Sequence, residues 1–206
     1  RIRVGRRPTD VTINDAGTTA YVVNTFGESV SIIDLDERET KGKILLGDLP
    51  DPATLSEVDQ GELLFYDASL SHDGWMSCHS CHTDGHTNGM LNDNFSDASF
   101  GAPKRVLSLL GRTGTEPFAW NAEAKDLVTQ IRKSITNTLQ SDNDPDEAQV
   151  AALAAYVRTL SGPPSIDRLR GVTDPAAIDR GSKQFRSLGC VRCHRPPTFT
   201  TPRTYD

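Results

Sequence analysis

The cysteines of this chain fall into two identical short patterns that could do chemistry. Each is a Cys-x-x-Cys-His motif: Cys78, Cys81 and His82, and then Cys190, Cys193 and His194. In this pattern two thiols add to the vinyl groups of one porphyrin, and the adjacent imidazole ligates its iron, which requires the tight spacing. The motifs therefore predict two covalent haem c groups, with His82 and His194 as proximal iron ligands.

Two other interpretations of the cysteine pairs stay open. A bare Cys-x-x-Cys is also typical of dithiol redox sites and of half a zinc site. Here a histidine follows each pair at once, and the pairs lie too far apart in the chain for a compact zinc ribbon. No strand-to-helix turn of a βαβ unit surrounds either pair. Haem attachment is therefore the favoured interpretation.

The ligand on the opposite face of the first haem has several candidates. Met90 would raise the reduction potential of the iron, as mixed Met/His ligation does. His86 follows His82 closely, so we expect it to stay on the proximal side and to bond a propionate or the backbone. His72 precedes the motif in a polar Ser-His-Asp-Gly stretch typical of an exposed turn. An open sixth position would instead suit peroxide.

Composition excludes several classes of partner. The chain has 206 residues, 36% of them hydrophobic, and a net charge of −6, with a pI of about 5.4. Neither nucleic acid nor an anionic membrane surface suits such a charge. No apolar run is long enough to predict a membrane span.

The cellular compartment follows from the haem hypothesis. The sequence has no pattern typical of a signal peptide and begins with Arg1, so we expect it to come from a longer protein. Because haem c is attached outside the cytoplasmic membrane, we expect a periplasmic or otherwise exported protein.

The first 50 residues alternate apolar and polar positions between turn sequences, which predicts antiparallel strands. The expected strands span residues 11–13, 19–24, 29–34 and 43–46. This segment resembles a YVTN-type β-propeller repeat, since Gly-x-x-Pro, Asp-Ala-Gly, Ala-Tyr-Val-x-Asn and Val-Ser-x-Ile-Asp occur in order. We therefore expect a single propeller-type blade, or alternatively a lone β-meander.

From residue 51 the patterns become helical. Ser56 is expected to cap one helix, Asn121 a second, and Asp144 a third with Pro145 at its first position. Asp174 is expected to begin a further helix just before the second motif. The predicted fold is mixed: a β-repeat at 1–50, a cytochrome c-like all-α haem domain at 51–164, and the start of a truncated second haem domain at 165–206.

Three stretches carry a wider resemblance. They are GELLFYDASLSHDGWMSCHSCH, APKRVLSLLGRTGTEPFAWN and GSKQFRSLGCVRCHRPPTF. Over roughly residues 50–206 the chain resembles bacterial di-haem cytochrome c peroxidases, including their methylamine-utilisation (MauG-like) branch. The resemblance implies two facing cytochrome c-like domains, one binding hydrogen peroxide and the other accepting electrons from a small cytochrome c or cupredoxin. A calcium ion between the haem domains is a further implication.

The same resemblance suggests catalytic positions. Trp120 matches a tryptophan placed between the haems, and Gln130 matches a glutamine of the peroxide pocket. Where typical peroxidases have a glutamate for acid/base catalysis, this chain has Gln140. An amide cannot carry a proton as a carboxylate does. Gln140 therefore puts peroxidase activity in question.

Three hypotheses follow for the function. The leading one is a di-haem oxidoreductase that passes electrons from a small redox protein to hydrogen peroxide or another acceptor. The second is an electron-transfer cytochrome without peroxidase activity, which Gln140 favours. The third is a redox appendage of a surface propeller that binds a partner.

Overall fold

The computed structural model describes residues 2–51, 54–95 and 99–203. The chain divides into two compact units, Arg1–Asp59 and Gln60–Asp206. The first is built on an antiparallel sheet and the second is mainly helical, so the predicted mixed fold is confirmed. None of the helices in the described ranges is long and apolar enough to cross a membrane.

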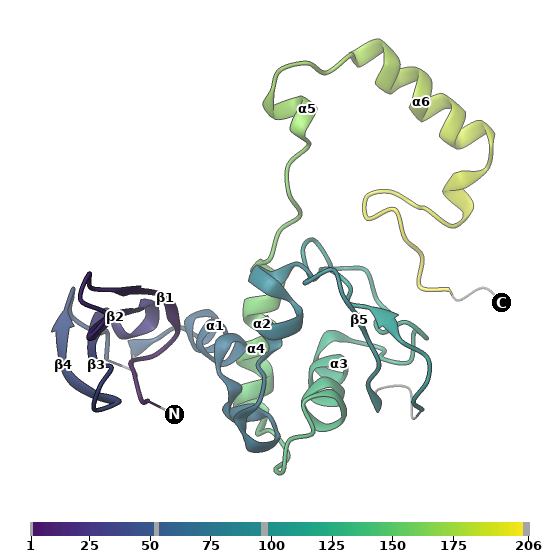
Figure 1. The fold of residues 1–206 in the computed structure, drawn as a ribbon. Coiled ribbons are helices and arrows are strands. Elements are labelled where there is room, and N and C mark those ends of the chain that lie inside the picture. Colours follow the sequence, from purple (N-terminus) through teal and green to yellow (C-terminus); the bar gives the residue numbers. More distant parts are fainter. Residues whose placement is uncertain (1, 52–53, 96–98, 204–206) are drawn as a thin grey trace. The chain divides into compact units, whose positions relative to one another are not determined.

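The first unit is a four-stranded antiparallel meander in the order β1-β2-β3-β4 (Figure 1). Its strands are β1 (Pro8–Ile13), β2 (Thr19–Asn24), β3 (Ser29–Asp34) and β4 (Glu39–Leu45). The middle strands have the predicted bounds. The first begins earlier than predicted, and the last spans 39–45 rather than 43–46 because Glu39 and Thr40 already pair with β3. Whether this sheet is a propeller blade stays a prediction.

Alternation along the central strands builds the core of this sheet. Ala20, Val22 and Ile33 are buried together on one face, as expected when successive side chains point to opposite faces. Asn24 is also buried, and its amide donates to the Ser31 hydroxyl over 2.9 Å. This bond satisfies a polar donor inside the sheet.

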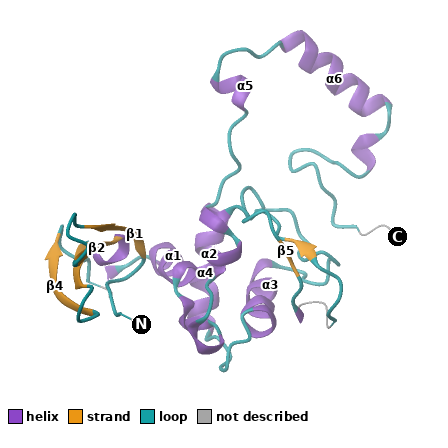
Figure 2. Cartoon of the chain, viewed as in Figure 1, coloured by secondary structure: helices purple, strands orange, loops and turns teal. Residues whose placement is uncertain are grey.

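The second unit combines short helices with long connecting loops (Figure 2). Its helices are α1 (Glu57–Tyr66), α2 (Cys78–Cys81), α3 (Leu127–Lys133), α4 (Glu147–Thr159), α5 (Ile166–Leu169) and α6 (Pro175–Ser187). A two-stranded ribbon, β5 (Leu91–Asn92) with β6 (Lys104–Arg105), lies in the loop between α2 and α3. The first haem motif therefore lies on α2 and the second directly follows α6.

Two of the predicted helix starts agree with the structure. The Ser56 hydroxyl accepts from the Asp59 amide over 3.2 Å, and the Asp59 carboxylate accepts from the Ser56 amide over 3.2 Å. This reciprocal pair closes the first turn of α1. Asp174 caps α6, and its carboxylate accepts from the Ala176 amide over 2.9 Å.

The other two predicted caps are wrong. Asn121 lies in a turn whose ends pair through Phe118 and Ala124, so α3 begins later, capped by Asp126. Helix α4 is capped by Asp146, whose carboxylate accepts from the Gln149 amide over 2.7 Å. Asp146 and Gln149 form a capping box, so the helix starts two residues after the predicted Asp144.

Helix α3 does not end normally but continues into a π-helical turn, Ser134–Thr138. The Leu139 amide donates to the Ser134 carbonyl over 2.9 Å, a five-residue step. Ile135 and Leu139, four residues apart, are both buried. The extra residue of a π turn changes the direction of the chain that follows it. Gln140 lies just after this turn and has a φ of +52°.

Helices α1 and α4 approach each other closely at a glycine. A Cβ on Gly61 would lie 1.9 Å from the Ala152 carbonyl oxygen. One turn later Phe65 is 1% exposed, and its ring centroid lies 5.3 Å from that of Tyr156. This crossing joins the helix that precedes the first motif to α4.

Helix α6 repeats the same Gly-x-x-x-Phe pattern just before the second motif. Gly181 and Phe185 of α6 have the same four-residue spacing as Gly61 and Phe65 of α1. No described side chain or non-local backbone atom lies within 4 Å of a Cβ built on Gly181. Gly61 is therefore packed against another helix and, among the described residues, Gly181 is not, so the two positions can be compared by the same substitution.

We predict that Gly61→Ala destabilises the protein by about 1–3 kcal/mol, because the new methyl group overlaps α4. Gly181→Ala should leave stability unchanged or raise it by up to about 1 kcal/mol, since alanine favours helix. Denaturant unfolding of the haem-loaded protein measures both. Equal effects of the two substitutions would contradict the packed crossing.

Candidate haem-binding sites

The first motif is held in a single helical turn. The Ser77 amide donates to the Ser80 hydroxyl over 3.0 Å, which caps α2. The His82 amide donates to the Cys78 carbonyl over 2.9 Å. Just beyond, Gly85 has φ of +75°, and a Cβ there would lie 2.8 Å from the Leu160 side chain. The turn thus packs against the segment that ends α4.

The imidazole of His82 is suited to ligate a metal as the neutral ring. Its Nδ1 is buried and has no hydrogen-bond partner of normal geometry among the described residues. Burial lowers the pKa of His82, and this outweighs the opposite effect of backbone groups at His86 and Leu107. A neutral ring with Nδ1 enclosed leaves Nε2 as the nitrogen that can reach an iron.

The thiols of the first motif are kept protonated. Burial raises the pKa of Cys78 to about 11, and burial also raises the pKa of Cys81. No cysteine is in a disulfide. Thioether formation adds S–H across a vinyl group, whereas zinc binds thiolates. Moreover, no group of three or more His, Cys, Asp or Glu in the described ranges could hold a metal ion, so the residues fit haem better than zinc.

The second motif repeats the arrangement on a 3-10 turn, Cys190–Arg192. Gly189 precedes it with φ of +78°, and the His194 amide donates to the Cys190 carbonyl over 2.9 Å. The Nδ1 of His194 lies 3.0 Å from the Phe199 carbonyl oxygen. As donor to this carbonyl, Nδ1 leaves Nε2 for iron, the tautomer common among metal-ligating histidines.

Apolar side chains around the first motif are exposed. They lie on the loops between α2 and α3: Met90, Leu91, Phe95, Phe100, Leu107 and Trp120. A porphyrin would cover apolar surface of this kind, so the surroundings of the motif also fit haem.

A chain of contacts joins the motif to Trp120. The Asn92 amide lies 3.7 Å from the Cys81 sulfur. Its neighbour Leu91 pairs with Arg105 across the β5–β6 ribbon. The Trp120 indole donates to the Arg105 carbonyl over 3.0 Å. The predicted relay tryptophan is therefore fixed to the ribbon that contacts the motif, although its side chain is 58% exposed.

Gln140 lines an open pocket of about 340 Å³. The other lining residues are Phe95, Phe100, Thr136 and Asn137. The two phenyl rings lie 5.2 Å apart between centroids. We call this feature the Gln140 pocket. It combines two aromatic rings with neutral hydrogen-bonding groups, and none of the lining residues in the described part of the chain is titratable.

Gln130 and Trp120 are not among the residues that line the Gln140 pocket. The Gln130 amide nitrogen donates to the Ser134 hydroxyl over 3.0 Å. Its Oε1 is buried with no hydrogen-bond partner in the described chain. Of the three residues with predicted catalytic roles, Gln140 alone lines this pocket, and all three roles stay predictions.

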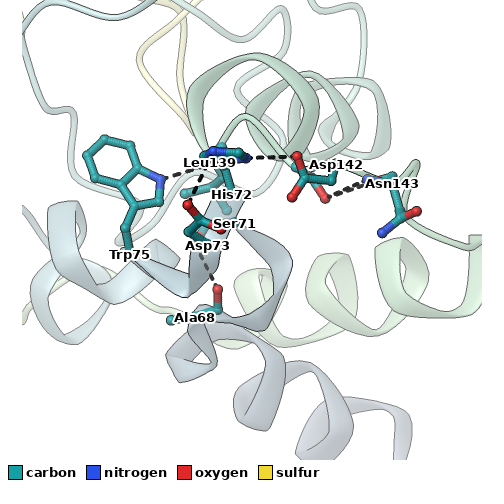
Figure 3. Close-up of polar contacts among 9 residues, drawn as sticks. Ala68, Ser71, His72, Asp73, Trp75, Leu139, Asp142 and Asn143 are labelled. Atoms are coloured by element: carbon teal, nitrogen blue, oxygen red, sulfur yellow. Dashed lines mark hydrogen bonds and ion pairs between the residues drawn. The ribbon is translucent and has the colours of Figure 1, made fainter. Parts of the chain in front are cut away.

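The candidates for a sixth ligand have different surroundings. His72 Nδ1 lies 2.8 Å from an Asp142 carboxylate oxygen (Figure 3). His86 Nδ1 lies 2.7 Å from the Ser108 hydroxyl rather than on the backbone. The Met90 side chain is 61% exposed. Both histidines thus have side-chain partners of their own, and Met90 stays the predicted ligand.

Sequence patterns did not indicate the contacts of His72 or the aromatic pair of the pocket. His72 and Asp142 lie 70 residues apart, and the sequence around Phe95 and Phe100 has no apolar periodicity. No local spacing rule relates such positions. Only covariation among relatives would have indicated them.

Comparison with known proteins decides the family. The sequence model of the di-haem cytochrome c peroxidase family matches residues 56–161. This chain belongs to the di-haem cytochrome c peroxidase family. Membership implies haem c as the cofactor, in agreement with the paired motifs.

Curated relatives point the same way. The methylamine utilization protein MauG of Methylorubrum extorquens is 28% identical, over 75% of this chain and 54% of that protein. The cytochrome c551 peroxidase of Nitrosomonas europaea is 26% identical, over 72% of this chain and 53% of that protein. The chain thus spans about half the length of the relatives it matches.

Two solved structures are similar. The hydrazine synthase of Kuenenia stuttgartiensis superposes with a TM-score of 0.58 at 27% identity, over 73% of this chain and 53% of that chain. A MauG-like protein associated with microbial copper homeostasis gives a TM-score of 0.51 at 21% identity, over 77% and 56%. The latter likeness concerns the fold alone.

We predict that replacing Cys78 and Cys81 together by serine lowers the haem content of the matured protein from two per chain to one. The matched control replaces Cys190 and Cys193 and should give the same loss, with the other motif retained. Pyridine haemochrome spectra and protein concentration give the ratio. An unchanged ratio in either variant would rule out that motif as an attachment site.

Proposed function

We propose that this chain is the haem-bearing part of a di-haem c-type oxidoreductase. It would pass electrons from a small cytochrome c or cupredoxin to hydrogen peroxide or another acceptor. The observation that carries this proposal is the pair of Cys-x-x-Cys-His turns in a member of the di-haem cytochrome c peroxidase family. In both turns Nδ1 of the histidine faces protein, which leaves Nε2 for iron.

The roles of the motif residues follow from this arrangement. Each cysteine pair would hold one haem by thioethers, and His82 and His194 would be the proximal ligands. The haem iron supplies one-electron chemistry that no side chain offers. The protein's part is to fix the ring orientation and to surround the porphyrin with apolar groups, as Leu107 and Trp120 would do.

The distal side of the first haem would include the Gln140 pocket. Its phenyl rings would exclude water, and its amides would orient a small ligand by hydrogen bonds. Trp120 would relay electrons between the two haem domains, and Gln130 would donate or accept a hydrogen bond in the peroxide pocket. Met90 would be the sixth ligand when no substrate is bound.

Gln140 favours a second candidate function. Among the residues that the structure describes, no carboxylate or imidazole lines the pocket. Cleaving an O–O bond needs a group that takes up and returns a proton, and amides do not do this near neutral pH. An electron-transfer cytochrome without peroxidase activity is therefore the alternative.

The sheet of the first unit supports a third candidate, a redox appendage of a surface propeller. Val23, Val30 and Ile44 lie side by side on the face opposite the buried core. Val23 is 36% and Ile44 48% exposed. Apolar residues on both faces are typical of a sheet covered on both sides. We propose that residues 1–50 are one YVTN-type propeller blade.

We further propose an exported, periplasmic setting, because haem c is attached outside the cytoplasmic membrane. A calcium ion between the haem domains belongs to the same proposal and rests on the family resemblance. Residues 51–164 and 165–206 would be its two cytochrome c-like domains, the second represented by its first helices and haem motif.

We predict that Gln140→Glu raises peroxide-dependent oxidation of reduced cytochrome c by about tenfold or more, because a carboxylate at this wall can shuttle a proton. The assay uses the haem-loaded, full-length protein. Asn137→Asp is the control, because it places a carboxylate elsewhere in the same pocket. Equal gains from both would argue against a specific role for position 140. No gain from either would leave the electron-transfer function as the better account.

A further inference from the structure

Two segments far apart in the sequence meet in space (Figure 3). One precedes the motif and includes His72 and Trp75; the other follows the π turn and begins at Leu139. The Leu139 carbonyl accepts from the His72 amide over 3.0 Å and from the Trp75 indole over 3.5 Å. One carbonyl thus receives two donors from the motif's own loop.

An ion pair joins the same two segments. His72 Nδ1 lies 2.8 Å from the Asp142 carboxylate, and His72 Nε2 lies 3.5 Å from the Asp73 carboxylate. The hydrogen bond to Asp142 raises the pKa of His72 above its ordinary value of 6.5, helped by the charges of Asp142 and then Asp73. These are the charged groups facing the ring from its own loop and from the opposing turn.

Gln140 lies between these anchors. Leu139, the residue before it, accepts hydrogen bonds from the His72 amide and the Trp75 indole. Asp142, two residues after it, contacts the His72 ring. The Ser141 amide donates to the Ile135 carbonyl over 3.1 Å. Gln140 itself has φ of +52°, a left-handed conformation that an L-residue adopts only when its surroundings impose it. Contacts on both sides therefore impose the conformation of Gln140.

We propose that His72 and Asp142 form a positioning pair that holds the Leu139–Asp142 turn against the loop of the first haem motif and so sets how Gln140 faces its pocket. The importance of this placement for ligands rests on the proposed function, in which that pocket is the distal side of a haem. The hold on the turn is a property of the polypeptide alone.

The pH dependence has a definite sign. A histidine whose pKa is raised in the folded state contributes fully below its unfolded value, and the contribution is lost as pH rises through the raised value. The pair therefore holds the turn most firmly below pH 6.5, the ordinary value. It weakens as the pH rises above that. Because both side chains are exposed, salt should weaken the pair as well.

The first test measures the hold on the turn in the haem-loaded, full-length protein by amide hydrogen exchange with mass spectrometry. Asp142→Asn and His72→Gln should each speed exchange in residues 139–142 by roughly two- to fivefold at about pH 6, as an exposed pair allows. Glu147→Gln is the matched control, since it removes the exposed pair with Arg132 at 2.7 Å without touching the turn. Unchanged exchange in Asp142→Asn, or equal acceleration in the control, would overturn the proposal.

The second test measures the consequence for a bound ligand, with carbon monoxide on the reduced protein as the probe. Its stretching frequency should shift as the pH rises from about 6 to 9, with the midpoint above the ordinary histidine value. Both pair variants should lose this transition and Glu147→Gln should keep it. A transition that persists in Asp142→Asn would contradict the positioning role.

The two tests separate the two claims. If Gln140→Leu leaves the carbon monoxide spectrum unchanged, the pocket is not the distal side of the haem, and the proposed role of Gln140 fails. Hydrogen exchange then still decides whether the pair holds the turn. If exchange is unaffected but the spectrum responds to Gln140→Leu, the pair fails as a positioning device while the proposed function stands.

Discussion

The structure depends on one constraint, the need for two thiols and one imidazole to reach a single porphyrin from five consecutive residues. A single turn of helix meets it, since the His82 amide bonds back to the Cys78 carbonyl over 2.9 Å. The second motif closes the same turn between His194 and Cys190. Two contacts support this turn: the close approach of Gly85 to Leu160, and the contact of the β5–β6 ribbon, which also binds Trp120, with Cys81.

Much of this was predictable because the signals are local. A five-residue motif needs no knowledge of tertiary structure, and period-two alternation gave the bounds of 19–24 and 29–34. Caps were harder, because several acceptors compete near each helix start. Asp126, and not Asn121, caps α3. Asp146, and not Asp144, caps α4, because Gln149 is placed to complete a reciprocal capping box with Asp146.

The features around Gln140 were not predictable from the sequence, for a physical reason. The π turn adds one residue to the helix, and no pattern in the sequence marks where it does so. The tether between His72 and Asp142 depends on two loops meeting in space. The resemblance to the peroxidases is enough to show that Gln140 stands where a glutamate is typical. That Gln140 lines a pocket together with Phe95 can be learned only from the three-dimensional structure.

Haem binding and peroxide chemistry therefore stand on different grounds. Haem rests on two motifs, the buried Nδ1 of His82, the hydrogen-bonded Nδ1 of His194 and family membership. Peroxide chemistry depends on the Gln140 pocket, whose described lining residues include no carboxylate or imidazole. Mass spectrometry of proteolytic peptides from the matured protein tests the central claim most directly. The account predicts one haem covalently attached to the peptide with Cys78 and Cys81, and one to the peptide with Cys190 and Cys193. Unmodified thiols on both peptides after expression with the haem maturation machinery would contradict it.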